Sequence, residues 1–499
     1  MRRHTSLLGG SGVRIATAFA LLCALAVGLA HAPAASALTC TSAGGSWSVA
    51  GTWTSAGNCN RVPLAGDDVV IGAGTTTLDA NSAALASLTV NGTLTIGNDA
   101  TGRSLSVAGD IVVGGSGTIS VGANAATHTL AAGGDVVNGG VINLAPAAGR
   151  VCNVTFNKNG GQTVSGAGAY TFNLITVNEG ASNTNVLDMQ AAITVPSPFL
   201  TITNGTYKHS SPSNIAPWTT AAGATIPATG GFWLNSAATV TTAVDVTVNG
   251  GILRIASGAL NVGSADGTRI MLGNFASTLL QMDGGVLTVT GGINSASGTA
   301  AGTFTMTGGT MNLQTIDAGP QYTLLLGTGT TLNWSGGTIV AAKGNNTTDD
   351  VDIRSATQNV TGGTLQMGSG TSSGNQISLI NGAGGSVTVW NLVLSQSNAN
   401  SILMRSSTNV LNDLTINALN TLAPNAGLAI NIGGGNGGGN WTNNGAFTQS
   451  TTVVSFVGSG SATIGGSTAT TFYGLTINKT AAALTSRKVT LGKNATVSN

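Results

Sequence analysis

Three aspartates in the second half of the chain carry the clearest suggestion of chemistry. They are Asp349, Asp350 and Asp352 of the stretch NNTTDDVDIR (345–354), in a 499-residue chain with only 16 acidic residues. Alternate residues of a β-strand face the same side, so a strand here would place Asp350, Asp352 and Arg354 on one face. Glycoside hydrolysis usually needs two carboxyl groups that flank the scissile bond. This face could supply half of such a site.

The same stretch also suits a cation. Calcium takes oxygen ligands from carboxylates and from amide carbonyls. The three aspartates, together with Asn345 and Asn346, therefore form a candidate metal site, and calcium is the cofactor that the sequence suggests if there is one. A third interpretation needs no ligand, because a loop followed by the solvated face of one strand would look the same.

A second acidic pair lies in NCNRVPLAGDDVVIGAG (58–74) as Asp67 and Asp68. Pro63 and Gly66 favour a turn, and an aspartate in a turn often hydrogen-bonds to nearby backbone. An apolar run follows directly at residues 69–71. We therefore predict that the two aspartates hold a turn at the entry to a strand, with calcium ligation as the alternative.

Other catalytic arrangements have little support. GTSSG (370–374) matches the nucleophile-elbow pattern around Ser372. That fold needs its histidine after the serine, whereas His128 and His209, the two histidines beyond residue 37, both precede it. No Cys/His cluster has the spacing of zinc ligands. We interpret the Lys208-His209 pair as part of a solvated strand or loop.

The N-terminus has the order of a secretory signal peptide. Arg2, Arg3 and Arg14 precede the apolar run IATAFALLCALAVGLA (15–30), and Ala35 and Ala37 occupy the small-residue cleavage positions. This order predicts export with cleavage after Ala37, and a retained anchor helix is the alternative. Residues 38–499 then carry 14 basic and 16 acidic residues, without a further long apolar run. That charge balance gives no sign of the basic surface that nucleic-acid binding requires. Without a further long apolar run, we predict no transmembrane segment after cleavage.

Three cysteines remain in the exported chain. Disulfides persist in exported proteins, and Cys40 with Cys59 is the pair that we favour. A loop of that size contributes about 3 kcal/mol in the chain-entropy model. Cys152 is then the odd one, buried or free. The alternative is that all three cysteines are unpaired.

Composition and repetition predict the fold that must position these residues. The chain has 75 glycines, 7% charged and 41% hydrophobic residues. Thr, Val and Ile favour strands, whereas Gly and Asn favour turns. Units that begin with two glycines recur 24 to 34 residues apart, at GGILRI (250–255), GGVLTV (284–289), GGTMNL (308–313), GGTIVA (336–341) and GGTLQM (362–367). Such a period indicates stacked repeats.

We predict an all-β, right-handed parallel β-helix with irregular coils of about 25 residues. Leu, Ile and Val would stack inside, Thr, Ser and Asn would face water, and glycine would occupy corners that need a positive φ. About 16 coils spaced ~4.8 Å apart would give a rod ~75 Å long. The irregular spacing predicts insertions and loops on at least one face.

A second pattern places an aromatic residue before Leu-x-apolar, as in FNLITVN (172–178), WNLVL (390–394) and YGLTIN (473–478). We interpret Phe172, Trp390 and Tyr473 as residues that stack between coils, and an aromatic platform for sugar is the alternative. GGGNGGGN (433–440) predicts a surface loop or hinge that separates the end of the rod from its body.

Residues 46–96 show a pattern found in one known family. Trp47 and Trp53 are followed by VPLAGDDVVI (62–71), a Thr-rich strand and ALASLTVNGTL (84–94). This stretch resembles the glycine-rich G8 module and the first coils of large bacterial surface β-helix proteins of adhesin or autotransporter type. The resemblance implies an extracellular rod, sometimes beside carbohydrate-active parts, and transfers no catalytic residue.

The expected organisation follows the chain. It comprises a signal peptide (1–37), a G8-like module with the first coils (38–97), the β-helix body (98–432), the Gly/Asn-rich loop (433–440) and C-terminal coils (441–499). The last segment ends within a repeat-like strand, so either an unrecognised cap closes the rod or the sequence is part of a longer protein.

The function expected from the sequence is that of a secreted, non-catalytic surface rod of adhesin type. Its partner would be an extracellular glycan or the surface of a host or neighbouring cell. The alternative is a carbohydrate-active or carbohydrate-binding β-helix, a polysaccharide hydrolase or lyase among them. A third idea, an ice- or crystal-surface binder, would need an evenly spaced threonine array, against which the variable repeat length argues.

Overall fold

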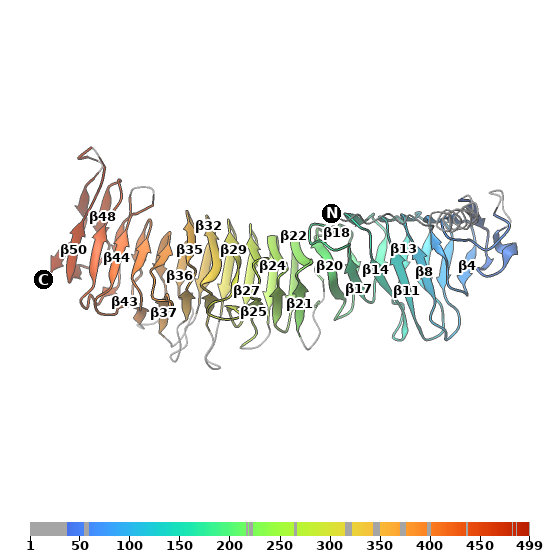
Figure 1. The fold of residues 1–499 in the computed structure, drawn as a ribbon, viewed down its shortest axis with the longest axis horizontal. Coiled ribbons are helices and arrows are strands. Elements are labelled where there is room, and N and C mark those ends of the chain that lie inside the picture. The colour runs from blue at the N-terminus through green and yellow to red at the C-terminus, as the bar shows by residue number, and fades with distance from the viewer. Residues whose placement is uncertain are drawn as a thin grey trace, which may run out of the picture.

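The chain folds into an elongated parallel β-solenoid of about 17 turns, stacked in chain order along the rod (Figure 1). The computed structural model describes residues 37–53, 59–215, 218, 223–263, 267–314, 322–342, 350–369, 376–396, 401–435, 438–481, 483–485 and 487–498. In these residues the regular elements are β-strands and one short 3-10 helix, η1 (Ala50–Trp53). The predicted all-β fold with parallel coils is therefore confirmed.

Among the described residues, the ladders between strands of neighbouring coils are parallel, and the strands form the faces of the rod. The largest sheet has 28 strands among the described residues: β1 (Thr39–Ser42), β3 (Asp68–Ile71), β5 (Ala84–Leu85), β6 (Ser87–Val90), β8 (Ser104–Val107), β9 (Ile111–Val113), β11 (Ala126–Ala132), β12 (Val136–Asn138), β14 (Arg150–Phe156), β15 (Gln162–Ser165), β17 (Ile175–Asn178), β18 (Val186–Met189), β20 (Leu200–His209), β22 (Gly230–Thr242), β24 (Ile252–Val262), β26 (Leu279–Met282), β27 (Val286–Val289), β29 (Ala301–Met306), β30 (Thr310–Leu313), β32 (Gly329–Trp334), β33 (Thr338–Ala341), β35 (Thr357–Val360), β36 (Thr364–Met367), β39 (Asn391–Leu394), β42 (Leu414–Ile416), β45 (Trp441–Asn443), β48 (Ala462–Gly465) and β51 (Val489–Leu491).

Smaller sheets complete the cross-section. The N-terminal coils add a sheet of β2 (Gly45–Ser46), β4 (Thr75–Leu78), β7 (Thr93–Ile96), β10 (Thr118–Val121), β13 (Val141–Asn143), β16 (Ala169–Thr171) and β19 (Ile193–Thr194). The later coils add a sheet of β21 (Ala224–Pro227), β23 (Val246–Asn249), β25 (Ile270–Leu272), β28 (Ile293–Ser295), β31 (Leu324–Leu326), β34 (Val351–Ile353), β37 (Ile377–Ile380), β40 (Ser401–Met404), β43 (Thr421–Pro424) and β46 (Ala446–Phe447). The last coils add two more, formed by β38 (Val387–Val389), β41 (Thr408–Val410), β44 (Ala429–Ile432), β47 (Val453–Phe456) and β50 (Gly474–Ile477), and by β49 (Thr470–Phe472) and β52 (Ala495–Val497).

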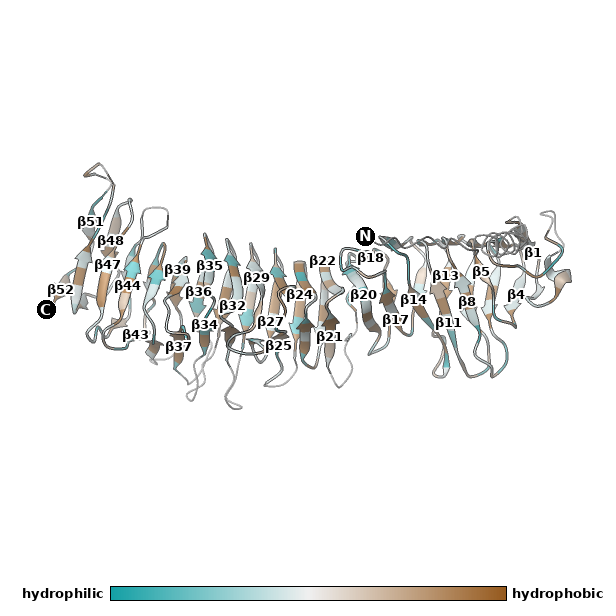
Figure 2. Ribbon diagram, in the orientation of Figure 1, coloured by the Kyte–Doolittle hydropathy of each residue, from teal (hydrophilic) through white to brown (hydrophobic). Residues whose placement is uncertain are grey.

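The core is a set of apolar ladders that run along the rod. In β7, Leu94 and Ile96 are buried while Thr93 and Thr95 remain partly exposed, as the period of two requires. Leu94 stacks in register on Ile119 of the next coil, and Ile119 on Ile142. Figure 2 shows the resulting mixture of hydrophobic and hydrophilic segments along the strands of the whole rod. Each coil thus buries its apolar face against its neighbours.

The repeated glycine pairs lie at corners. The second glycine has a positive φ in four of the pairs, at Gly285, Gly309, Gly337 and Gly363. A Cβ on Gly309 would also lie 2.7 Å from backbone atoms of the preceding coil. The strands after these four corners stay in one-to-one register from β27 through β30, β33 and β36, whereas the residues that follow Gly250-Gly251 pair with β26. The variable repeat length is therefore absorbed outside the strands.

The Gly/Asn-rich stretch at 433–440 lies between two paired strands. Leu414 before it and Trp441 after it are paired in the parallel ladder of β42 and β45. Lys479 donates to the carbonyl oxygens of Gly438 and Val457, at 2.8 and 2.7 Å. Paired strands therefore lie on both sides of this stretch, and the surface loop or hinge expected here stays a prediction.

Candidate functional site

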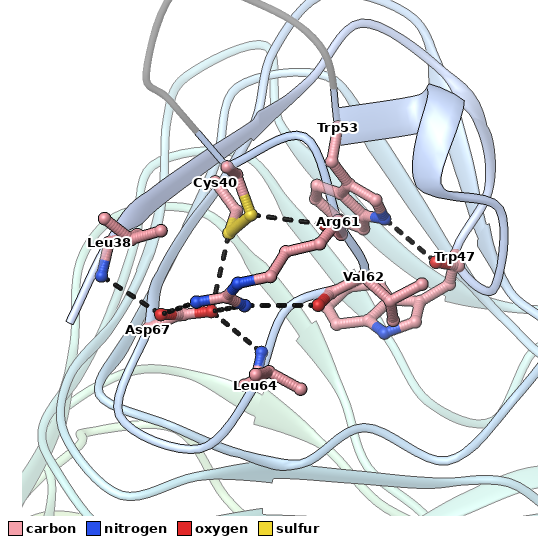
Figure 3. Close-up of a disulfide and its surroundings, with 9 residues drawn as sticks. Leu38, Cys40, Trp47, Trp53, Arg61, Val62, Leu64 and Asp67 are labelled. Carbon is pink, nitrogen blue, oxygen red and sulfur yellow. Dashed lines mark hydrogen bonds and ion pairs between the residues drawn. A yellow bond between two sulfur atoms is a disulfide. The ribbon is translucent and has the colours of Figure 1, made fainter. Parts of the chain in front are cut away.

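Asp67 is the polar centre of the first coils (Figure 3). Its carboxylate is buried and accepts bonds from Arg61 Nη1 at 2.6 Å and Nη2 at 3.0 Å, and from the N–H groups of Leu64 and Leu38. Burial opposes ionisation, but these four donors outweigh it and lower the pKa of Asp67. Asp68 instead begins β3 and accepts a bond from Ser87. The predicted turn is thus held by Asp67.

The structure joins Cys40 to Cys59 in a disulfide beside this carboxylate. The two sulfurs and an oxygen of Asp67 lie within 4.8 Å of one another, but the sulfurs are bonded together and the carboxylate is occupied by Arg61. Trp47 and Trp53 pack edge to face with ring centroids 4.8 Å apart, and Trp53 Nε1 donates to the carbonyl of Trp47. These contacts hold the first coil together, which is a structural role.

Cys152 is a free, buried thiol in β14. It lies in register with His128 of β11, and desolvation raises the pKa of its thiol. Because the thiolate is the reactive form, this cysteine is unreactive in the folded rod.

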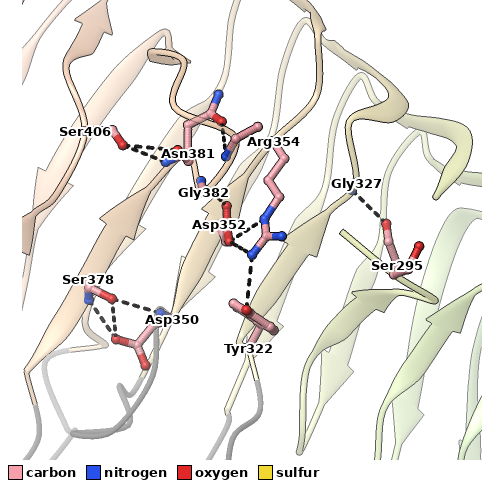
Figure 4. Close-up of polar contacts among 12 residues, drawn as sticks. Ser295, Tyr322, Gly327, Asp350, Asp352, Arg354, Ser378, Asn381, Gly382 and Ser406 are labelled. Atoms are coloured by element: carbon pink, nitrogen blue, oxygen red, sulfur yellow. Dashed lines mark hydrogen bonds and ion pairs between the residues drawn. The ribbon is translucent and has the colours of Figure 1, made fainter. Parts of the chain in front are cut away.

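Asp350 and Asp352 flank the first residue of β34 and are almost completely buried, at 1% and 0% exposure (Figure 4). Asp350 accepts bonds from the N–H and Oγ of Ser378, at 2.7 and 3.2 Å. Asp352 accepts from Arg354 Nη2 at 2.6 Å and from Gly382 N–H at 2.9 Å. The interpretation of a solvated strand face is therefore wrong, because contacts from later coils cover both carboxylates.

The metal hypothesis for this stretch remains a prediction. Asp349, Asn345 and Asn346 lie outside the described residues, as does Ser372. The carboxylates of Asp350 and Asp352 both bind groups of the protein itself. In the described residues, then, these two aspartates join neighbouring coils to one another.

The two histidines are separated and both are buried. His128 of β11 accepts a bond from the N–H of Arg103, while Nε2 of His209 lies 2.9 Å from the carbonyl oxygen of Ser213 in the loop after β20. The strands β11 and β20 are three pairings apart in the sheet. Burial lowers the pKa of each imidazole. The expectation that His209 lies on a solvated strand is wrong, whereas Lys208 does face outward.

Lys208 belongs to a stack that sequence reasoning missed. Along the outer face of the sheet, Asp188, Lys208, Trp233 and Arg254 are in register. Lys208 Nζ lies 4.8 Å from the ring centroid of Trp233, and Arg254 Cζ lies 4.3 Å from it. Each cation pairs with an aspartate, Lys208 with Asp188 and Arg254 with Asp283. The cations come from the coils on either side of Trp233, so the indole lies between Lys208 and Arg254.

The signal for this stack was present in the sequence. In FWLN (232–235) the period of two sends Phe232 and Leu234 inward, so Trp233 must face out. The aromatic residues chosen from the sequence behave differently. Phe172 is buried against Phe156 and Tyr170, which confirms its stacking role, while Trp390 and Tyr473 are half-buried.

Glu179 is the single glutamate of the chain and was not selected from the sequence. It follows β17 and is completely buried, and neither of its carboxylate oxygens has a hydrogen-bond partner. Desolvation raises the pKa of Glu179 to about 8, against a smaller opposing effect from Lys158. The carboxyl group is therefore mostly protonated at neutral pH.

An uncharged polar ladder runs along the outside of the N-terminal sheet. Successive coils place hydroxyl or amide side chains in register, in the order Ser46, Thr77, Thr95, Ser120, Asn143, Thr171 and Thr194. A second row beside it contains Thr75, Thr93 and Thr118. Because paired strands lie about 4.8 Å apart, successive residues along each row are separated by about 4.8 Å. The spacing along these rows is therefore even despite the variable repeat length, but the longer row also contains Ser46, Ser120 and Asn143 and is not a threonine array.

The described residues contain no helix long and apolar enough to cross a membrane. Comparison with curated proteins and with solved structures gives no match. The G8-like module expected at 38–97 is matched from residue 52 onward and over a longer stretch, which reaches the end of β11. The start of this β-solenoid, residues 52–132, matches the family model of the G8 domain.

Proposed function

We propose that this chain is an exported, non-catalytic rod of adhesin type, which presents its faces to an extracellular glycan or to a neighbouring cell surface. The observation that carries the proposal is the outer ladder from Ser46 to Thr194, in which every residue offers a hydroxyl or an amide and none carries a charge. Such groups donate and accept hydrogen bonds without the desolvation cost of ions. The G8 match and the solenoid fold support a surface-type role.

Two features of the rod favour a role in binding through its outer faces over a catalytic role. The most prominent charged groups, Asp67, Asp352 and the stack around Trp233, are paired with protein partners. The ladder is also continuous over several coils, and a rigid array of weak contacts gains affinity by acting together.

The test is adhesion of cells that display the rod to immobilised glycans and to neighbouring cells. Thr95→Lys/Ser120→Lys places two charges in the ladder, and we expect it to reduce adhesion at least about tenfold, a loss of ~1.4 kcal/mol. Thr288→Lys/Asn312→Lys is the matched control, because these residues are also in register and half-exposed but lie on another sheet. Equal adhesion by both variants, or a rod that stays inside the cell, would refute the proposal.

A carbohydrate-active rod is the second candidate, since Arg354, which is paired with Asp352, lines a surface pocket. Turnover of a polysaccharide by the natural chain, lost in Asp350→Asn/Asp352→Asn, would establish this alternative in place of the first. The same variant tests calcium. If these carboxylates bind the ion, calcium chloride raises the Tm of the natural rod above its value in EDTA and leaves the variant unchanged.

A further inference from the structure

Glu179 is a buried carboxyl group without a partner among the described residues. It follows β17, its exposed fraction is 0%, and neither of its carboxyl oxygens has a hydrogen bond. A neutral carboxyl group can remain in such a place, whereas an ionised one without a partner is strongly disfavoured away from water. Ionisation of Glu179 therefore requires that a part of this corner of the rod moves aside and admits water.

The loop 180–185, which joins β17 to β18, packs against Glu179. Its last residue returns to the glutamate, since the side chain of Asn185 donates to the carbonyl oxygen of Glu179. The backbone of Asn185 and the side chain of Glu179 also meet at Gly205, where a Cβ would lie 3.1 Å from Asn185 O and 2.5 Å from Glu179 Cβ. None of the residues of this loop is buried, so the loop is the part of the corner that can move.

Hydrogen bonds fasten the loop to the coils that follow it. Thr206 donates from its Oγ1 to the carbonyl oxygen of Asn183 at 2.6 Å, and from its N–H to that of Asn185 at 2.8 Å. The side chain of Asn183 donates to the carbonyl oxygen of Ala228 at 3.4 Å. A segment that buries little apolar surface opens at a lower free-energy cost than the whole fold. The loop can therefore open while the sheets of the rod stay paired.

The charged groups around this corner are already paired with one another. Lys158, after β14, and Asp135, before β12, act on the pKa of Glu179 with opposite signs, and they form an ion pair at 3.0 Å. Asp188 of β18 and Lys208 of β20 form a second ion pair at 2.9 Å. Neither cation has a hydrogen bond to Glu179 among the described residues. The closed loop therefore offers an ionised Glu179 no counter-ion of its own.

We propose that the loop 180–185 is a proton-operated lid, which stays closed while Glu179 is protonated and opens when this carboxyl group loses its proton. The inference goes beyond the proposed role of the rod, because it depends neither on the polar ladder nor on a partner. Opening releases one proton at any pH between 4.5, the ordinary pKa of the hydrated group, and about 8, its pKa under the closed lid. In that interval the ratio of open to closed lids rises about tenfold per pH unit.

The test is hydrogen exchange of the exported chain between pH ~6.5 and ~8, with each rate divided by the intrinsic rate of an unstructured peptide. The amides of Asn185 and Thr206 report the lid, because both donate to carbonyl oxygens of the loop. We expect their normalised rates to rise about tenfold per pH unit in the natural chain and to stay constant in Glu179→Gln. Asp135→Asn is the matched control, since it also replaces a carboxylate near this corner by an amide, and it should keep the rise.

A second measurement needs no variant. Glu179 is the single glutamate of the chain, so labelling with carbon-13 glutamate gives one side-chain carboxyl signal. We expect this signal to keep its protonated chemical shift at pH ~6 and to change only at higher pH. A signal that titrates near pH 4.5, normalised exchange rates that do not depend on pH in the natural chain, or an equal rise in Glu179→Gln would overturn the proposal. Loss of the rise in Asp135→Asn would assign the proton to Asp135 and would overturn it too.

Discussion

The side chain of Glu179 occupies space that Gly205 leaves open. A Cβ on Gly205 would lie 2.5 Å from Cβ of Glu179 and 3.2 Å from its Cγ. Gly205 also has a φ of +82°, a conformation that glycine adopts without steric cost. The glycine therefore permits the burial of a carboxyl group between two coils, and this burial makes the stability of the rod depend on pH.

For Glu179 the folded pKa of about 8 lies above its ordinary value of 4.5. The folded state therefore holds the proton more tightly, and the stability from this group is lost as the pH rises from about 4.5 to about 8. We expect Glu179→Gln to raise the free energy of unfolding at about pH 9 by at least ~2 kcal/mol more than at about pH 5. Urea unfolding of the natural chain and the variant at both pH values measures this difference. If Glu179→Gln changed the free energy of unfolding equally at both pH values, Glu179 would not be protonated in the rod.

The stability contributed by the two buried histidines has the opposite dependence on pH. Burial lowers the pKa values of His128 and His209 below their ordinary 6.5. The stability from each is complete above about pH 6.5 and falls as the pH drops below it, because the unfolded chain then binds more protons. We expect His209→Phe to lose less stability than the natural chain between pH ~7 and ~5. Thermal unfolding across this interval is the measurement, and an unchanged slope would contradict the prediction.

The adjacent aspartates at the first coil should differ sharply when replaced. Asp67→Ala leaves Arg61 and two N–H groups without their acceptor, and breaking a buried ion pair costs about 3–5 kcal/mol. Asp68→Ala removes one bond from Ser87, for a loss of about 1 kcal/mol. Hydrogen exchange of the strands β1, β3 and β6 reports local opening of these coils. Similar protection in both variants would argue against Asp67 as the anchor.

The corner glycines should also separate into two kinds. Gly309→Ala meets both a positive φ and backbone atoms at 2.7 Å, so we expect a loss above ~2 kcal/mol. Gly427→Ala meets a positive φ of +74° with open space around it, and we expect about 1 kcal/mol. Denaturant midpoints of the two variants give the comparison. If both lose the same stability, close contact between corners is not what requires glycine.

The coils could be read from the sequence because their signals are local. A glycine pair followed by alternating apolar residues, as in GGTMNL (308–313), fixes a corner and a strand within six residues. The turn around Asp67 was equally local, since Pro63, Gly66 and the apolar run lie within nine residues. Stacking then repeats the same local solution along the rod.

Features that depend on which loops meet were not predictable in this way. The burial of Asp352 depends on Gly382, 30 residues later, and the pocket at Arg354 forms only when that loop lies over the coil. Glu179 is buried because of a glycine 26 residues away. A period-two pattern predicts only whether a side chain points inward or outward. It does not predict contacts between residues this far apart in the sequence.

The direction of the ladder bonds has a mechanical consequence. Parallel pairing from coil to coil aligns these hydrogen bonds with the long axis, so tension along the rod acts on them one coil at a time, as in peeling. Resistance is then set by the weakest coil and not by the number of coils. Two interactions stabilise the first coil against such peeling, the disulfide between Cys40 and Cys59 and the ion pair between Asp67 and Arg61.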